Sequence, residues 1–215
     1  MNSKCKTILV LMMVCFALLI SSCNKKKTTD PIDPYQIEII DFGGHQWRVL
    51  ARQGDKALII SENILEQRVY HENYENITWE NCTLRQYLNG AFYNTFNEAN
   101  KARIAEVTNV NLNNQHYGTN GGNNTQDKIF LLSLSEVVQY FGDSGQLGNN
   151  FYFDDQYNSK RIATYNGSAF WWWLRSPGSG GSGASYVSDT GRILLDGHSF
   201  AITFGGVRPA LWLNM

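Results

Sequence analysis

The chain has 215 residues, of which 43% are hydrophobic and 17% are charged, and its formal net charge is −1. This length suits one domain with a hydrophobic core of its own. The basic residues form no stripe apart from Lys25, Lys26 and Lys27, so we expect no nucleic acid among the partners.

The first 22 residues have the order of a secretory leader. Lys4 and Lys6 precede an apolar run over residues 8–20, and two serines precede Cys23. A membrane-spanning helix takes about 20 apolar residues, and this run has thirteen. We therefore expect residues 1–22 to act as a signal peptide. Without Lys4 and Lys6 the chain keeps 16 basic and 19 acidic side chains, a net charge of −3.

The end of the leader, Leu19-Ile20-Ser21-Ser22-Cys23, resembles the lipobox of bacterial lipoproteins. This resemblance implies a palmitate-bearing lipoprotein with the lipid on Cys23, and two or more acyl chains anchor a protein stably. We expect residues 23–34 to be a polar tether and the protein to lie in the bacterial cell envelope, lipid-anchored to the outer membrane and facing the periplasm or the surface. A plain signal peptide and a free Cys23 form the alternative.

The globular part, residues 35–215, is expected to begin with a three-stranded meander over 35–42, 45–51 and 57–61, turned first at Gly43-Gly44. Thr78 then favours the start of a helix with apolar positions up to Phe92 and a stop or break at Asn89-Gly90. Cys82 lies among those apolar positions, which favours a buried residue over a reactive thiol.

Asn97 with Glu98 indicates a short second helix that carries Ile104 and Val107. Residues 111–126 are rich in asparagine and glycine and predict a loop. The apolar run over residues 127–132 predicts a buried strand.

A third helix is expected to be capped by Ser133 or Ser135, with Leu134, Val137, Val138 and Phe141 facing inward. The remainder predicts short strands at 169–175, 184–188, 192–195, 200–204 and 210–213. Strands first, helices in the middle and strands last predict a single α+β domain with antiparallel sheets, in which the first and last strands pair.

The segment from Phe170 to Gly178 is the densest apolar stretch of the mature chain. Alternation along a strand puts Trp171, Trp173 and Arg175 on one face. That face could be a ligand-binding platform, since aromatic rings and guanidinium groups stack on ligands and on each other. The alternative is that both faces are buried and Arg175 binds backbone carbonyls. The candidate ligand-binding residues are Trp171, Trp173, Arg175 and Arg208.

No catalytic motif is recognisable. Gly142-Asp143-Ser144-Gly145 resembles the surroundings of a trypsin-type nucleophile but lacks the required histidine and aspartate frame. The four histidines are scattered, which predicts no transition-metal site. Asp154-Asp155 could offer oxygens to calcium, although solvated loop carboxylates are the better interpretation. We therefore assign no catalytic residue, metal or cofactor.

Five ordered blocks carry a wider resemblance, and they lie at 42–50, 79–89, 127–136, 172–178 and 206–210. They resemble an uncharacterised family of bacterial extracytoplasmic domains, a domain of unknown function. The late Trp-Arg strand and the closing Gly206-Val207-Arg208 are distantly similar to C-type lectin-like and formylglycine-generating-enzyme-like domains, which implies a possible C-type lectin-like architecture. The chain lacks the disulfide cysteines, the calcium motif and the redox cysteine pair of those families.

The leading functional hypothesis is a membrane-tethered, non-catalytic binding or adhesion module for glycan, peptide or envelope protein. The alternative is an envelope glycan hydrolase that uses carboxylates such as Asp127, Glu136 or Asp154, brought together only by the fold. A structural envelope component with protein partners is a third hypothesis.

Overall fold

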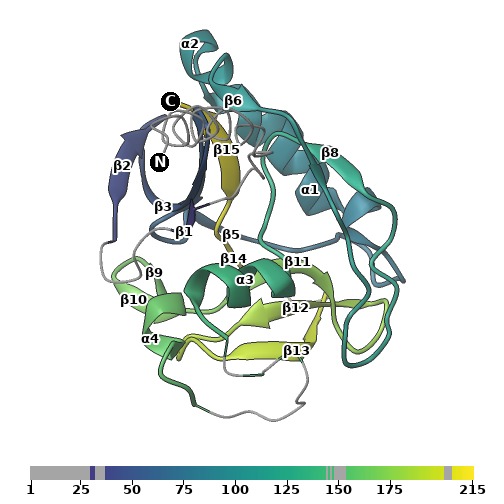
Figure 1. Cartoon of the computed structure of the whole chain (residues 1–215). Coiled ribbons are helices and arrows are strands. Elements are labelled where there is room, and N and C mark those ends of the chain that lie inside the picture. Colours follow the sequence, from purple (N-terminus) through teal and green to yellow (C-terminus); the bar gives the residue numbers. More distant parts are fainter. Residues whose placement is uncertain (1–29, 32–36, 144, 146, 148–153, 201–204) are drawn as a thin grey trace, which may run out of the picture.

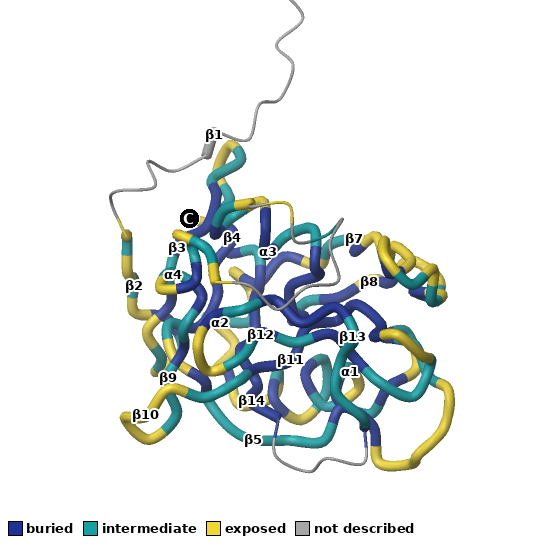
Figure 2. The backbone as a smooth tube through the Cα atoms, turned by 90° about the horizontal axis from the view of Figure 1, so that it is seen from below, coloured by how far each residue is buried: buried dark blue, intermediate teal, exposed yellow. Residues whose placement is uncertain are grey.

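The computed structural model describes residues 30–31, 37–143, 145, 147, 154–200 and 205–215. They form a single α+β domain with mainly antiparallel sheets and short helices, as expected. The two larger sheets have six and five strands. Figure 1 shows the first of them in the upper half, the second in the lower half and α3 in front of the lower sheet. Figure 2 shows that the buried chain runs through the middle of both sheets, while exposed segments lie in loops and hairpin tips.

The upper sheet has the order β1-β3-β4-β15-β6, and β2 also pairs with β3. The predicted meander is confirmed, because β2, β3 and β4 pair in sequence with Gly43-Gly44 in the first turn. The last strand lies against the meander, with Ala210 opposite Ile60, so the first and last strands pair as predicted. The strands are β1 (Asp30–Pro31), β2 (Ile39–Phe42), β3 (His45–Gln53), β4 (Lys56–Ser61), β6 (Ile104–Ala105) and β15 (Ala210–Asn214).

The predicted helix after Thr78 is divided into short pieces. Cys82 has an extended backbone (φ −69°, ψ 150°) that separates a 3-10 turn from α1, and the Cys82 Sγ accepts a hydrogen bond from the Arg85 amide at 3.4 Å. Thr78 makes no side-chain cap. The helix continues through Asn89-Gly90 as a π turn. The pieces are η1 (Trp79–Asn81), α1 (Thr83–Tyr87), η2 (Leu88–Phe92) and η3 (Tyr93–Thr95).

The second helix, α2 (Glu98–Lys101), is capped by Asn97 as predicted, with the Asn97 Oδ1 accepting from the Asn100 amide at 2.8 Å. The helix is shorter than predicted, because Ile104 lies in β6 and Val107 begins β7 (Val107–Asn109). β7 pairs with β8 (Thr125–Asp127), and residues 110–124 between them form a loop. The loop predicted over 111–126 is therefore confirmed except for its last two residues, which belong to β8.

Residues 127–132 are not a regular strand, although Ile129, Phe130, Leu131 and Leu132 are buried as predicted. The Phe130 amide donates to the Ala210 carbonyl of the upper sheet at 2.9 Å, and the Leu132 carbonyl accepts from the Arg175 amide of the lower sheet at 3.0 Å. This segment therefore joins the two sheets, and its backbone bonds go to two different partners instead of one ladder.

The helix α3 (Leu134–Phe141) confirms its prediction. Ser133 accepts from the Glu136 amide, Glu136 accepts from the Ser133 amide, and the four predicted inward residues are buried. The reciprocal pair is a capping box, which satisfies two backbone donors at the start of the helix.

The lower sheet has the order β13-β12-β11-β14-β5, and β11 pairs with β14 in parallel. The predicted strand over 169–175 is divided at Trp171, and its first part forms a hairpin with β9 through Asn166-Gly167, both with positive φ. The predicted strand over 200–204 falls mainly on 201–204, outside the described residues. The elements are β5 (Glu66–Arg68), α4 (Asn158–Arg161), β9 (Ala163–Tyr165), β10 (Ser168–Phe170), β11 (Trp172–Pro177), β12 (Gly183–Val187), β13 (Ile193–Ser199) and β14 (Gly205–Val207).

Within these described ranges, no helix has the length and apolar character needed to cross a membrane. The expected signal peptide, Cys23 and most of the expected tether lie outside the described residues.

Candidate functional site

The strand β11 is buried on both faces. Trp172 and Trp173 are fully buried, and each indole donates to a backbone carbonyl, Trp172 to Arg161 at 3.1 Å and Trp173 to Arg68 at 3.0 Å. Phe141 of α3 lies 6.5 Å from Trp172, and Tyr70 lies 5.6 Å from Trp173, ring centre to ring centre. The sequence allowed either a ligand-binding platform or burial of both faces, and Trp173 is buried. Its ring therefore has no surface on which a ligand could stack.

Arg175 is also buried, and its guanidinium makes four hydrogen bonds to three partners. Its Nη1 donates to the Leu131 carbonyl at 2.7 Å and to Glu136, its Nη2 donates to Glu136 at 3.0 Å, and its Nε donates to the Asn111 side chain at 3.2 Å. A guanidinium offers five N–H donors in a rigid fork, and here the fork ties the strand to α3 and to the asparagine-rich loop. The predicted carbonyl-binding role of Arg175 is present.

Arg208 lies in the core between the two sheets. Its Nε donates to the Ser61 carbonyl at 2.8 Å, its Nη2 donates to the Glu62 carbonyl at 3.1 Å, and the guanidinium lies over the Trp172 ring at 5.1 Å. Burial lowers the pKa of Arg208 to about 9, with the charge of Arg48 adding to the shift and that of Glu62 opposing it. Arg208 therefore stays charged at neutral pH and holds the segment after β14 to the end of β4. It has no exposed surface that a ligand could contact.

Trp171 is the one candidate of the four that is partly exposed. It lies between β10 and β11 and is the centre of a row of partly exposed rings, which we call the aromatic strip. The ring centres lie 5.0 Å apart for Trp171 and His198, 5.4 Å for Trp171 and Tyr186, and 5.9 Å for Trp171 and Phe170. The strip consists of Tyr165, Phe170, Trp171, Tyr186 and His198.

The strip forms because four strands bring its members together. Tyr165 and Phe170 come from the β9–β10 hairpin, Tyr186 from β12 and His198 from β13, and the register places Ala184 opposite His198. Tyr186 and His198 lie 5.1 Å apart, and both lie within 5.4 Å of Trp171. Rings at these separations contact one another. No ligand group fits between them, so the strip can act only through its outer surface.

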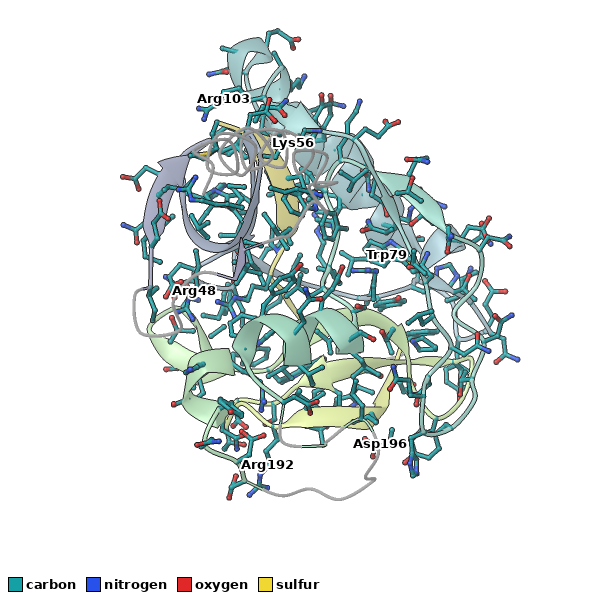
Figure 3. All side chains as sticks on the ribbon, in the orientation of Figure 1. Arg48, Lys56, Trp79, Arg103, Arg192 and Asp196 are labelled. Atoms are coloured by element: carbon teal, nitrogen blue, oxygen red, sulfur yellow. The ribbon has the colours of Figure 1, made fainter. Side chains whose placement is uncertain are left out.

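The strip is electrically neutral near pH 7. Burial lowers the pKa of His198, and the charge of Asp196 only partly offsets that effect. Burial and the charges of Asp196 and Asp189 raise the pKa of Tyr186. The acidic groups lie around the strip, and Figure 3 shows Asp196 at the lower rim of the molecule. The site therefore offers apolar ring surface with an acidic border.

The two glycines of β14 pack closely against the tryptophan segment. A Cβ on Gly205 would lie 1.8 Å from the Trp173 Nε1, and a Cβ on Gly206 would lie 2.5 Å from the Trp171 carbonyl oxygen. The Gly206 amide donates to that carbonyl at 3.2 Å. Only glycine permits β14 to approach the tryptophan segment this closely.

Asp127 is buried and accepts hydrogen bonds from four side chains at 3.1 Å or less, those of Trp79, Arg85, Asn109 and Thr125. Figure 3 shows Trp79 pointing into the body of the molecule. Both oxygens of this carboxylate accept hydrogen bonds from the protein, so its role is structural and no lone pair is directed at a ligand.

The other proposed carboxylates are also paired with arginines. Glu136 binds Arg175, and Asp154 binds Arg192 with Nε–Oδ1 and Nη2–Oδ2 distances of 2.7 Å. The hydrogen bond from Arg192 lowers the pKa of Asp154. Asp155 binds Arg161 at 3.0 Å. Among the described residues, no group of three or more His, Cys, Asp or Glu side chains could hold a metal ion.

Cys82 is buried, as predicted, and burial raises the pKa of its thiol to about 12. A thiol with this pKa is almost entirely protonated at pH 7 and is a poor nucleophile. Gly142 is the C-terminal cap of α3, while Ser144 lies outside the described residues.

Sequence reasoning selected Trp171 but missed Tyr186 and His198. Both belong to strands whose register cannot be derived from the chain alone, and His198 was one of four scattered histidines. The available signal was the turn at Asn166-Gly167, which marks a tight hairpin next to the tryptophans and therefore an interruption of the strand at Trp171.

Comparison with known proteins gave no match to a curated protein and no match to a solved structure. The expectation of an uncharacterised domain family is confirmed, and the matched region contains four of the five sequence blocks but begins after the first. The model of a domain of unknown function, DUF6273, matches residues 54–215, which is most of the chain, and the protein therefore belongs to this family.

Proposed function

We propose that this protein is a non-catalytic binding module that holds a glycan on the aromatic strip, and that lipid on Cys23 tethers it to the outer membrane of a bacterial cell. The single observation that carries the binding proposal is the continuous row of partly exposed rings around Trp171. Sugar rings present apolar C–H faces, which stack on aromatic rings.

The electrostatics favour an uncharged or weakly polar ligand. The strip itself is neutral near pH 7, and Asp189 and Asp196 border it. An anionic ligand would meet like charges at this border, whereas a neutral glycan would find acceptors for its hydroxyl groups. A peptide or an envelope protein is the partner to search for if the titration with glycans shows no saturable binding.

The hydrolase alternative has less support. Glycoside hydrolysis needs two carboxyl groups about 5 to 9.5 Å apart that are free to donate or accept a proton or to attack. Asp127, Glu136 and Asp154 are each paired with a different arginine instead.

The membrane part of the proposal rests on the leader. Its apolar run, the lipobox-like Leu19–Cys23 segment and the polar residues after Cys23 support a lipid anchor, and hence a periplasmic or surface position. Labelling with a palmitate analogue tests it, with Cys23→Ser beside the wild type. Label that persists in Cys23→Ser would contradict the anchor.

A C-type lectin-like architecture belongs to the same proposal. Its support is the parallel pairing of β11 with β14, with Trp172 opposite Gly206, because the two sequence blocks that carry that resemblance become neighbouring strands. An experimental structure would test it by superposition on lectin-like domains.

The binding test compares two partly exposed tryptophans. The purified chain is titrated with soluble polysaccharides and peptidoglycan fragments, and tryptophan fluorescence and reducing-sugar release are measured together. Trp171→Ala should abolish saturable quenching, whereas Trp212→Ala in β15 should preserve it. Equal binding by both variants would overturn the strip as the site, and release of new reducing ends would overturn the non-catalytic proposal.

A further inference from the structure

A second concave surface shares no residue with the aromatic strip, and we call it the asparagine groove. It has a volume of about 290 Å³ and is formed by three separate segments of the chain. This volume is at the lower end of the range for small-molecule sites, roughly 300 to 1,000 Å³. The lining residues are Asn76, Ile77, Thr78, Asn81, Thr119, Asn120 and Gly181.

The walls of the groove are fixed against one another. The Ile77 amide donates to the Gly181 carbonyl at 2.9 Å, and a Cβ on Gly181 would lie 2.9 Å from the Asn76 Cγ. A Cβ on Gly122 would lie 2.6 Å from the Thr78 Oγ1. The two glycines therefore mark close approaches that hold the groove in shape, and a site that is already formed loses less entropy on binding.

The polar side chains of the groove are available to a ligand. Asn120 uses its Oδ1 to accept from the Gly122 amide at 3.0 Å. Within the described part of the chain, no protein hydrogen bond engages the side chains of Asn76, Thr78, Asn81 and Thr119. The neighbouring surface over residues 110–115 differs, because its Asn111 and Asn114 amides hold the loop and β11 together.

The chemistry of the lining selects a class of ligand. Amides and hydroxyls supply both donors and acceptors, and none of the lining residues is charged. A phosphate, carboxylate or ammonium group would lose its water there without gaining an opposite charge. Hydroxyl and acetamido groups, in contrast, pair with amides in both directions.

We propose that the asparagine groove is a second binding site, for the neutral end of a saccharide of roughly one or two rings, given its volume. It shares no residue with the aromatic strip. The two sites are neighbours, because Gly181 lies three residues before Ala184, which pairs with His198 of the strip.

The test is a set of 1H–15N spectra of the purified chain during titration with N-acetylglucosamine, galactose and cellobiose. The side-chain amides of Asn76 and Asn81 and the backbone amide of Gly181 should shift in a saturable way with at least one of these sugars. Asn76→Ala should weaken that binding by about tenfold, the loss of one to two hydrogen bonds, and Asn81→Ala repeats the test at a second position.

One variant serves as the control. Asn94→Ala, at an exposed asparagine in η3, should bind the groove ligand like the wild type. Glucuronate and a blocked diglycine peptide are titrated beside the neutral sugars. Absence of saturable shifts at the groove, equal shifts with glucuronate, or stronger shifts with the peptide would each overturn the proposal.

Discussion

Arg175 in β11 joins the lower sheet to α3 through Glu136, with its Nη2 3.0 Å from Glu136 Oε1 and its Nη1 in contact with Oε2. The same Glu136 accepts from the Ser133 amide at 2.7 Å and so closes the capping box. The helix start and the sheet are therefore held by one carboxylate.

Replacement of Arg175 by Met should destabilise the fold by about 3 kcal/mol, because it leaves Glu136 without its cation and the Leu131 carbonyl without its donor. Urea unfolding at neutral pH measures this free energy. The double variant Arg175→Met with Glu136→Gln should recover part of the loss. A double variant that loses the sum of both single effects would contradict coupling through the ion pair.

Removal of the Asp127 carboxylate should destabilise the fold at least as much. Asp127→Ala leaves the Trp79 indole, the Arg85 guanidinium and two further donors without an acceptor, which predicts a loss of about 3 to 5 kcal/mol. The matched control is Asp154→Asn at an exposed ion pair, which should change the unfolding free energy little, since such pairs contribute little. Thermal unfolding of both variants would show the difference, and similar midpoints would refute the central role of Asp127.

The sequence predicts α3 well because local signals coincide there. Ser133 and Glu136 have the spacing of a capping box, and Leu134, Val137, Val138 and Phe141 follow a helical period, so local and tertiary preferences agree. The helix after Thr78 shows the opposite case. Its period is helical, but Cys82 adopts an extended backbone that the periodicity does not reveal.

The aromatic strip was only partly predictable for a related reason. A dense run of tryptophans indicates ring surface, but which rings remain exposed depends on the sheets packed against the strand. Trp173 is covered by Tyr70 and by the close approach of Gly205, whereas Trp171 lies at the division between β10 and β11. Tyr70 and Gly205, which cover Trp173, come from distant parts of the chain. Alternation along the strand alone could therefore not show that Trp173 is buried and Trp171 is partly exposed.

The close approach of β14 gives a direct test of this packing. Gly205→Ala places a methyl group only 1.8 Å from the Trp173 Nε1, and overpacking of this kind costs about 1 to 3 kcal/mol. Gly180→Ala is the control, since a Cβ there meets no atom within 4 Å. Denaturant unfolding should separate the two variants clearly. A Gly205→Ala protein as stable as Gly180→Ala would show that the indole can move aside freely.

His198 should make the fold less stable as the pH becomes mildly acidic. Burial lowers its pKa below the usual value of about 6.5, so the folded state favours the neutral imidazole. Above the unfolded pKa this preference costs nothing. As the pH falls below about 6.5 and through the lowered folded pKa, the unfolded state binds the proton more readily and stability is lost.

His198→Gln should therefore lose less stability than the wild type between about pH 7 and pH 5, because glutamine does not titrate in that range. His116→Gln, at an exposed histidine, is the matched control and should retain the wild-type pH dependence. Urea unfolding at several pH values measures the slope, and an NMR titration of the His198 imidazole gives its pKa directly. An imidazole pKa above the usual value would reverse the predicted sign, because stability would then be lost as the pH rises, and it would mean that the charge of Asp196 outweighs burial in the aromatic strip.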